Sequence, residues 1–296
     1  PGKKSCFPPF SIGNDQYLPG LSGLPYTNYM QRLAAIILLA AALLAGCSKI
    51  PDPDPVDNPK VVILMYHRIT QGEAVNLYER SAEEFENDLL YLRQKKIEVI
   101  DFNELEAVVS GERKLTTHAV IITFDDGDHS WYTLAAPLLK KHRMKATFFL
   151  WASKIGADSF LSWDEVKLMS SYVWDGGVRP FSFGSHTMSH HYLMTMKEAT
   201  GGGDAFQAYL DEELGGSKVL IDRNIYGTVE VLALPYGDGA GDPDIIDAAL
   251  RHGYRFIRTS ERNVTGTPST DLLRLPSLPL LDDTEQELIG GYLGIE

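Results

Sequence analysis

The stretch Ala119-Val120-Ile121-Ile122-Thr123-Phe124-Asp125-Asp126-Gly127 joins an apolar, largely β-branched run to two adjacent carboxylates. A continuous apolar run of this length predicts a strand that is covered on both faces, as in a parallel sheet. Two neighbouring carboxylates repel each other, so they are costly to hold together unless a cation lies between them. The stretch therefore predicts a buried strand that ends at a cation site.

A second motif about sixty residues later, His186-Thr187-Met188-Ser189-His190, supplies two imidazoles. Their i, i+4 spacing predicts a single helical turn with both rings on one face, which is the geometry that two ligands of one ion need. Together with Asp126 they form a three-ligand set that leaves positions open for water and substrate, as in catalytic metal sites. Asp125 is then free to act as a base.

Further apolar runs predict more strands of the same kind. Near-continuous runs lie at 61–65, 119–124, 146–151 and 229–234, and weaker ones lie at 97–100, 181–183 and 254–257. Helices are predicted between them, because Ser81 with Glu84 and Ser162 with Glu165 form capping boxes. Asp242-Pro243 and Gly253 bracket another helix. About seven strand and helix units predict a parallel α/β barrel.

The polar residues that follow these strands support the barrel. They are His67, Asp125, Asp126, His186 and Tyr236, and each comes after the C-terminal end of a predicted strand. Active sites of parallel α/β barrels lie at that end of the strands. We therefore expect these side chains to meet at one site.

The same residues carry a family resemblance. Thr123-Phe124-Asp125-Asp126-Gly127 and His186-Thr187-Met188-Ser189-His190 resemble the first two signature motifs of the polysaccharide deacetylases (carbohydrate esterase family 4, NodB-like). The opening Leu64-Met65-Tyr66-His67-Arg68-Ile69 and the variant Leu234-Pro235-Tyr236-Gly237 are most similar to the lipoprotein branch that de-N-acetylates poly-N-acetylglucosamine. The resemblance implies a distorted (β/α)7 barrel in a single catalytic domain, residues 61–296. It also implies a hydrolase that removes N-acetyl groups from a cell-surface or exported polysaccharide.

A mechanism follows from the motifs and the resemblance. A divalent metal, zinc first and cobalt, nickel or iron as alternatives, is expected on Asp126, His186 and His190, where it activates a water molecule and polarises the acetamide carbonyl. Asp125 is expected to take the proton of that water. The resemblance assigns the backbone N–H of Tyr236 to the oxyanion that forms.

Two positions depart from the family pattern. Many members have an arginine two residues before the Pro-Tyr pair to steady the base, but this chain has Ala233 there, and we expect Arg274 to replace it in space. Members also usually supply a general acid from a histidine near the C-terminus, and the corresponding segment, 278–281, contains none. We assign that role to His67, with a buried structural histidine as the alternative.

The N-terminal part of the chain predicts export. Residues 1–29 precede the first Met and are expected to be a leader without a structural role, and residues 30–47 read as a signal peptide. Its end, Leu44-Ala45-Gly46-Cys47, resembles a lipobox, so Cys47 would be acylated and anchor the protein in the bacterial cell envelope. The alternative is an ordinary signal peptide with an incidental cysteine. Residues 48–60, rich in Pro and Asp, predict an extended tether of roughly 35 to 40 Å at about 3.1 Å per residue.

The net charge of the chain limits the classes of molecule that it can bind. The formal net charge is -13. It becomes -15 once residues 1–47 are removed, because they contain Lys3, Lys4 and Arg32 against Asp15. An acidic surface excludes nucleic acid and favours a neutral or partly deacetylated, cationic glycan.

Two other functions fit parts of the pattern. Two histidines and one carboxylate are also the facial triad of non-haem iron oxygenases. The other alternative is a lipid-anchored glycan-binding protein of the same fold. It would be catalytically weak or inactive because it lacks the arginine and the C-terminal histidine. The four tryptophans, at 131, 151, 163 and 174, are expected in the core rather than on a sugar platform.

Overall fold

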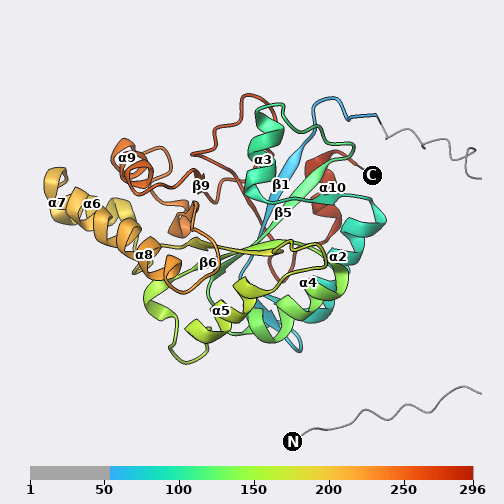
Figure 1. The fold of residues 1–296 in the computed structure, drawn as a ribbon, viewed down its shortest axis with the longest axis horizontal. Helices are drawn as coiled ribbons and strands as arrows, with labels where there is room; N and C mark the ends of the chain where they lie inside the picture. Colours follow the sequence, from blue (N-terminus) through green and yellow to red (C-terminus); the bar gives the residue numbers. More distant parts are fainter. Residues whose placement is uncertain (1–53, 296) are drawn as a thin grey trace, which may run out of the picture. The chain divides into compact units, whose positions relative to one another are not determined.

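A curled parallel sheet organises the computed structural model, which describes residues 54–295 (Figure 1). Its strands run in the order β10-β1-β5-β6-β7-β8-β9. They are β1 (Val61–Tyr66), β5 (Ala119–Asp126), β6 (Ala146–Leu150), β7 (Phe181–Ser185), β8 (Val231–Ala233), β9 (Phe256–Arg258) and β10 (Leu278–Pro279). Short β4 (Glu98–Val99) pairs with the start of β5. With its surrounding helices this sheet is the distorted (β/α) barrel that was predicted.

One segment near the C-terminus connects the two sides of the sheet. The Thr259 N–H donates to the Leu275 carbonyl (2.7 Å), which ties the segment to the end of β9. Leu278 in β10 pairs with Leu64 in β1, and the Leu280 N–H donates to the Met65 carbonyl (2.9 Å). The barrel therefore closes through only a few hydrogen bonds, which accounts for its distortion.

Helices cover the sheet, α3 (Phe102–Val109) on the inner face and the others on the outer face (Figure 1). The others are α2 (Ala82–Gln94), α4 (Ala136–His142), α5 (Trp163–Ser171), α6 (Leu193–Thr200), α7 (Gly203–Leu210), α8 (Ser217–Asp222), α9 (Pro243–Arg251) and α10 (Glu287–Leu293). Both predicted capping boxes are present, at the starts of α2 and α5, and Asp242 caps α9. A separate pair, β2 (Arg68–Thr70) and β3 (Glu79–Ser81), follows β1.

Strand residues alternate between two apolar clusters. Val62 and Leu64 of β1 pack in the larger cluster, beneath the outer helices. Ile63 packs with Ile121, Phe149 and Phe256 in a smaller cluster, and apolar residues of α3 pack against these strand residues. Because alternate residues of a strand point to opposite faces, the smaller cluster marks the barrel interior.

The N-terminal predictions are met only in part. The expected leader, the signal peptide and the lipidated Cys47 lie outside the described residues. Residues 54–60 form no helix or strand, but the Val56 N–H donates to the Leu115 carbonyl (2.8 Å) and the Lys60 N–H to His118 Nδ1 (3.1 Å). The last part of the predicted tether is therefore docked on the domain, because its backbone finds hydrogen-bond partners there. The first part of the predicted tether, 48–53, lies outside the described residues.

Candidate metal and catalytic site

Three potential metal ligands converge beyond the ends of β5 and β7. His190 Nε2 lies 3.3 Å and His186 Nε2 lies 3.5 Å from Asp126 Oδ1, and the two Nε2 atoms are 3.1 Å apart. Two ligands at about 2.0 to 2.2 Å from a tetrahedral zinc ion are about 3.3 Å apart. Asp126 Oδ1 is also buried without a hydrogen-bond partner among the described residues. These residues therefore fit a divalent metal with little movement.

The two histidines reach this geometry from a loop and not from a helix. Residues 186–192, between β7 and α6, are not helical, and Thr187 (φ 64°) and His190 (φ 57°) are left-handed. The His190 N–H donates to Thr187 Oγ1 (3.0 Å), which stabilises the turn. The predicted helical turn was wrong, because two left-handed residues fold the chain back and bring the rings together at the same sequence spacing.

His186 and Asp126 are in the protonation states that a metal needs. His186 Nδ1 donates to the Ala233 carbonyl (2.8 Å), which leaves Nε2 as the ligand atom. Burial lowers the pKa of His186 to about 4, so the ring is neutral at pH 7. Burial opposes ionisation of Asp126, but the His190 imidazole 3.3 Å away and the other nearby imidazoles outweigh burial and lower its pKa. Neutral imidazoles and an ionised carboxylate are the ligand forms that bind a divalent ion.

Asp125 lies beside the ligands but has a different partner. It is buried, and its Oδ2 accepts a hydrogen bond from Nη2 of Arg258 on β9. His186 Nε2 is 3.8 Å from the same oxygen. Asp125 Oδ1 has no hydrogen-bond partner among the described residues. One carboxylate oxygen is therefore fixed and the other is free to accept a proton.

Arg274 does not take this position. Its guanidinium pairs with Glu261 (2.6 Å), and both side chains are half-exposed. The expectation that Arg274 replaces the missing arginine was wrong, because Arg258 already fills that space from the barrel interior. Arg258 directly follows the predicted strand 254–257, so the rule that identified the other site residues, polar groups at strand ends, would also have found it.

His67 follows β1 at the edge of the same site. Its backbone carbonyl accepts a hydrogen bond from Trp131 Nε1 (2.6 Å), and its ring meets Tyr78 edge-on at 5.1 Å. Nδ1 is buried without a hydrogen-bond partner among the described residues.

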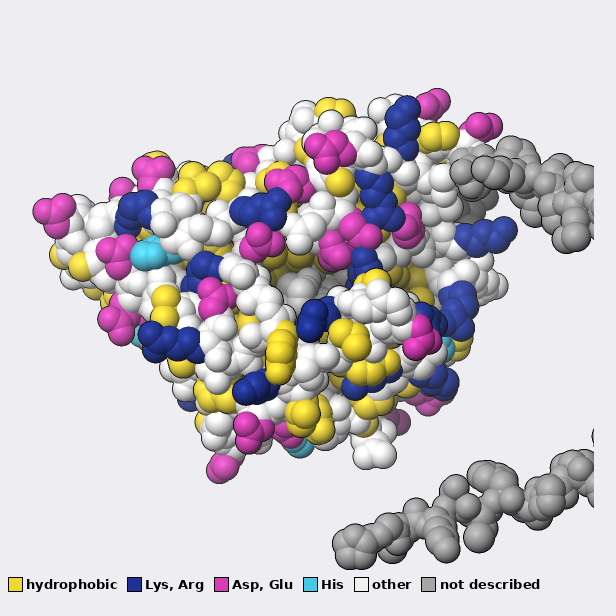
Figure 2. All heavy atoms as spheres, viewed as in Figure 1, with side chains coloured by type: hydrophobic (Ala, Val, Ile, Leu, Met, Phe, Trp, Pro, Cys, Tyr) yellow, Lys and Arg dark blue, Asp and Glu magenta, His cyan; other side chains and the backbone are white. Residues whose placement is uncertain are grey.

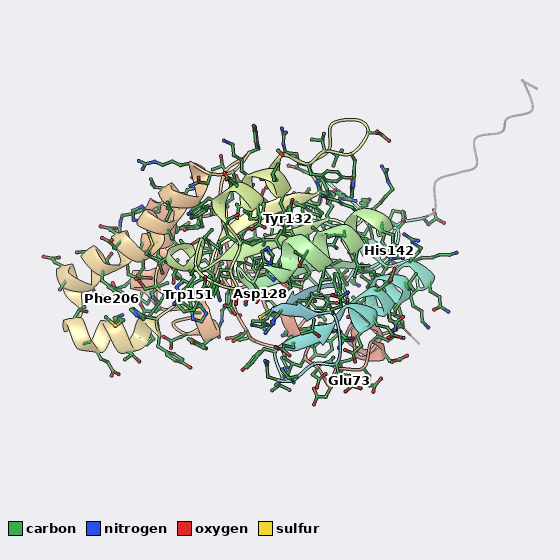
Figure 3. All side chains as sticks on the ribbon, turned by 90° about the horizontal axis from the view of Figure 1, so that it is seen from below. Glu73, Asp128, Tyr132, His142, Trp151 and Phe206 are labelled. Carbon is green, nitrogen blue, oxygen red and sulfur yellow. The ribbon has the colours of Figure 1, made fainter. Side chains whose placement is uncertain are left out.

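Aromatic rings surround the ligands. The turn Pro235–Gly237 after β8 holds Tyr236 at φ 61°, and its half-exposed ring stacks on Tyr192 at 4.0 Å and meets His190 edge-on at 4.8 Å. Gly237 permits this turn, because a Cβ there would lie 2.9 Å from the Ser260 backbone nitrogen. Trp151 stacks on the other side of His190 at 4.7 Å. In the view of Figure 3, the labels of Trp151 and Asp128 are adjacent, and Asp128 follows Asp126 by two residues.

Tryptophan placement was predicted only in part. Trp131 is buried in the core as expected. Trp151 instead lies at the site, because the strand that it follows, β6, lies between β5 and β7 in the sheet. Tyr78 and Tyr192 were not predicted as site residues. Aromatic type alone gives no signal that distinguishes them from packing residues.

A parallel barrel with acids, histidines and an arginine at the carboxyl ends of its strands has the arrangement of a barrel enzyme. Residues 112–257 match the family model described as polysaccharide deacetylase. These residues therefore belong to the polysaccharide deacetylase family. The assignment removes the non-haem iron oxygenase alternative.

Curated relatives agree with the family. YxkH of Bacillus subtilis (strain 168), provisionally named a polysaccharide deacetylase, is 29% identical over 202 residues, which are 68% of this chain and 65% of YxkH. The chain thus spans slightly less than two thirds of that relative. Poly-beta-1,6-N-acetyl-D-glucosamine N-deacetylase of Staphylococcus aureus (strain MSSA476) is 25% identical over 286 residues, covering 88% of this chain and 95% of that protein.

Solved structures share the fold. IcaB from Ammonifex degensii is 24% identical with a TM-score of 0.67, and the match covers 81% of this chain and 99% of IcaB. Streptococcus pyogenes deacetylase PplD, solved in complex with acetate, has the same TM-score and coverage at 22% identity. Both matches confirm the barrel over nearly the whole described part of the chain.

Proposed function

We propose that the protein is a metal-dependent deacetylase that hydrolyses the N-acetyl groups of a polysaccharide of the N-acetylglucosamine type. The observation that carries this proposal is the convergence of Asp126, His186 and His190 beside Asp125, a buried carboxylate with one free oxygen. A relative that aligns with 88% of the chain is named for this reaction on poly-beta-1,6-N-acetyl-D-glucosamine, which supports the substrate class.

Each step of the proposed reaction is assigned to a residue of the chain. When bound, a divalent ion, zinc before cobalt, nickel or iron, polarises the amide carbonyl and makes a water molecule a stronger nucleophile. Asp125 accepts the proton of the attacking water on Oδ1, while Arg258 holds Oδ2 and fixes the orientation of the carboxylate. The backbone N–H of Tyr236 donates to the oxygen that becomes negatively charged in the tetrahedral intermediate.

Breakdown of the intermediate requires a proton for the leaving amine, and we assign its donor as His67. His67 follows β1, which pairs with β5, the strand that carries Asp125 and Asp126. Its Nδ1 has no partner among the described residues, and its backbone is fixed by Trp131. The segment where the family usually places its acid is here β10 and the residues after it, which pack in the core as part of the barrel closure. A purely structural His67 remains the alternative.

The surface of the site suits a sugar polymer. Tyr78, Tyr192 and Tyr236 are each about half-exposed, and flat aromatic faces stack on pyranose rings. Each deacetylation leaves a cationic amine on the glycan, and the chain carries an excess of acidic residues. On the face seen in Figure 2, acidic and basic side chains are intermixed, unlike the continuous basic patch of a nucleic-acid-binding protein.

We propose an exported protein that is attached to the cell envelope through acylated Cys47. The lipobox-like sequence and the named substrate of the relative, a polysaccharide, support this location. Among the described residues, no helix is long and apolar enough to cross a membrane.

The test is acetate release from a panel of N-acetylated glycans, measured after chelation and again after zinc is returned. We expect activity to disappear and recover. His190→Ala should lose bound metal and activity together, since two remaining ligands hold a divalent ion poorly. Asp125→Asn should keep the metal and lose about 10²- to 10⁴-fold in turnover.

Two results would contradict the proposal. Full activity in chelator would remove the metal from the mechanism. A wild-type protein that binds zinc and acetylated oligosaccharide but releases no acetate would instead favour the glycan-binding alternative.

A further inference from the structure

A buried carboxylate lies directly behind the loop that carries the two histidines. Glu213 is 2% exposed and belongs to a π-helical turn, Asp211–Gly216, between α7 and α8. The three elements form one continuous helical segment, 203–222, which Figure 1 draws in yellow and orange. Single π-helical turns inside α-helices often occur at functional sites. Here the turn points an acid at the histidine loop.

Glu213 binds the backbone of that loop twice. Its Oε2 accepts the Ser189 N–H (2.8 Å), and its main-chain carbonyl accepts the Met188 N–H (3.0 Å). Ser189 and Met188 are two of the three residues between His186 and His190. The carboxylate therefore holds the part of the chain that sets the distance between the two imidazoles.

The loop needs such support because its backbone is strained. Thr187 and His190 both have positive φ, a conformation that is unfavourable for a residue with a side chain. Residues in such conformations persist where the surrounding structure fixes them. Without its hydrogen bonds to Glu213, the loop would be free to relax and the imidazoles to separate.

The other contacts of Glu213 also argue for a role in positioning. Its side-chain partners among the described residues are the Ser189 N–H and the Tyr209 hydroxyl, and it forms no ion pair within 4.0 Å there. A buried carboxyl group without a cationic partner is costly to the fold, so packing alone does not explain it. Burial and the Glu213 carboxylate raise the pKa of Tyr209, whose hydroxyl also contacts His191 Nδ1 (3.0 Å).

The helical segment is itself fixed in place. Gly215 packs against the ring of His252, where a Cβ would come within 2.4 Å of the ring. Ser217 Oγ lies 2.7 Å from Ser185 Oγ, which accepts the Thr187 N–H (3.1 Å). The segment thus contacts the loop near its start and at its centre.

We propose that Glu213 is a positioning residue for the metal site, holding the 186–190 loop so that both imidazoles reach one ion. This inference rests on the proposed function, because it concerns the same ligands. It predicts that Glu213 affects metal affinity through the loop, without touching metal or substrate.

The experiment measures the zinc dissociation constant of the full chain by chelator competition, together with the melting temperature of the zinc-free protein. Glu213→Met keeps the volume of the side chain and removes the acceptor, so zinc affinity should fall about 10- to 100-fold, as for other residues that orient ligands. Glu213→Gln keeps an amide oxygen that accepts the Ser189 N–H, so its affinity should stay within about threefold of wild type.

Asp88→Asn is the matched control. Asp88 is another fully buried carboxylate, bound by Arg80 and the Tyr66 hydroxyl and not by the histidine loop. This variant should melt at a lower temperature with unchanged zinc affinity. Equal zinc affinity in Glu213→Met and wild type, with a lower melting temperature as in Asp88→Asn, would overturn the positioning role.

A measurement on the wild type keeps the inference testable if Glu213→Met does not fold. The Ser189 amide of the zinc-free protein should be protected from hydrogen exchange, and exchange at the rate of a free amide would overturn the proposal. Failure of the proposed function has a different signature, because then the wild type itself would not bind zinc.

Discussion

Asp125 and Arg258 meet because both occupy interior positions of their strands. Ile121, Thr123 and Asp125 share one face of β5, and Phe256 and Arg258 share one face of β9. The guanidinium lies over the Phe149 ring (5.2 Å) and reaches Met65 Sδ (3.1 Å). The charge pair is thus enclosed on the side away from the metal ligands.

Removing Arg258 should therefore be costly in two ways. Arg258→Ala leaves Asp125 buried without its cation, and breaking a buried pair lowers the unfolding free energy by about 3 to 5 kcal/mol. Turnover should fall as well, because the carboxylate loses its fixed orientation. Denaturant unfolding and acetate release measure the two effects.

Arg274→Ala is the control and should match wild type in both measurements. A larger loss of turnover in Arg274→Ala than in Arg258→Ala would restore Arg274 as the partner of the base.

The buried His186 predicts a pH dependence of the metal-free protein. Its pKa is about 4 in the fold, against an ordinary value of 6.5. Between these values the unfolded state binds more protons, so the unfolding free energy should fall as the pH falls from about 6.5 to about 4. Melting temperatures in chelator measure this, and His186→Asn should show a shallower slope. An equal slope in both proteins would assign the effect to other groups.

The ligand set could be predicted from sequence because it depends on residue type and on strand ends. Asp126, His186 and His190 lie together as expected, although the conformation of their loop was predicted incorrectly. An i, i+4 spacing fits both a helical turn and a loop with left-handed residues, and nothing in the sequence 186–190 distinguishes the two. Glu213 could not be predicted, because its contact depends on a π-helical turn far along the chain.

At the level of elements, every predicted apolar run contains a strand, and only the short strands β2, β3 and β10 were not predicted. Runs such as 61–65 and 119–124 are buried on both faces and therefore carry a strong signal. β10 has two residues, one of them proline, so it has no pattern to recognise. Its position is set by the partners on either side, which only the folded chain supplies.

Tyr192, between β7 and α6, and Tyr236, after β8, predict an effect on polymer substrates that small substrates do not show. Tyr192 stacks on Tyr236 above the ligands, and such aromatic pairs contribute about 0.5 to 1.5 kcal/mol. Tyr192→Ala should raise KM for an N-acetylated oligosaccharide about 2- to 10-fold while kcat on a small aryl acetate stays unchanged. Tyr226→Ala, another half-exposed tyrosine, is the control. A loss on the aryl acetate equal to that on the oligosaccharide would place Tyr192 in the chemistry and not in glycan binding.

At the level of the whole molecule, the proposed attachment to the envelope depends on residues outside the described part of the chain. Cys47→Ser should abolish acylation and move the protein from the membrane to the soluble fraction, because the sequence that follows, 48–60, is rich in Pro and Asp and supplies no apolar anchor. Fractionation with a radiolabelled or clickable fatty acid measures both effects. Membrane retention of Cys47→Ser would mean that another contact holds the protein there.

The closure of the barrel has a consequence for how the chain acquires its shape. One edge of β1 receives its partner from a segment more than two hundred residues later, so this pairing is among the most distant in the sequence. Contacts of that range form slowly, because a long loop must close before they stabilise anything. A ribosome that has made only the first 270 residues carries a domain with an exposed, apolar strand edge, which is prone to association. The pairing of β10 with β1 is therefore the step that covers this exposed strand edge.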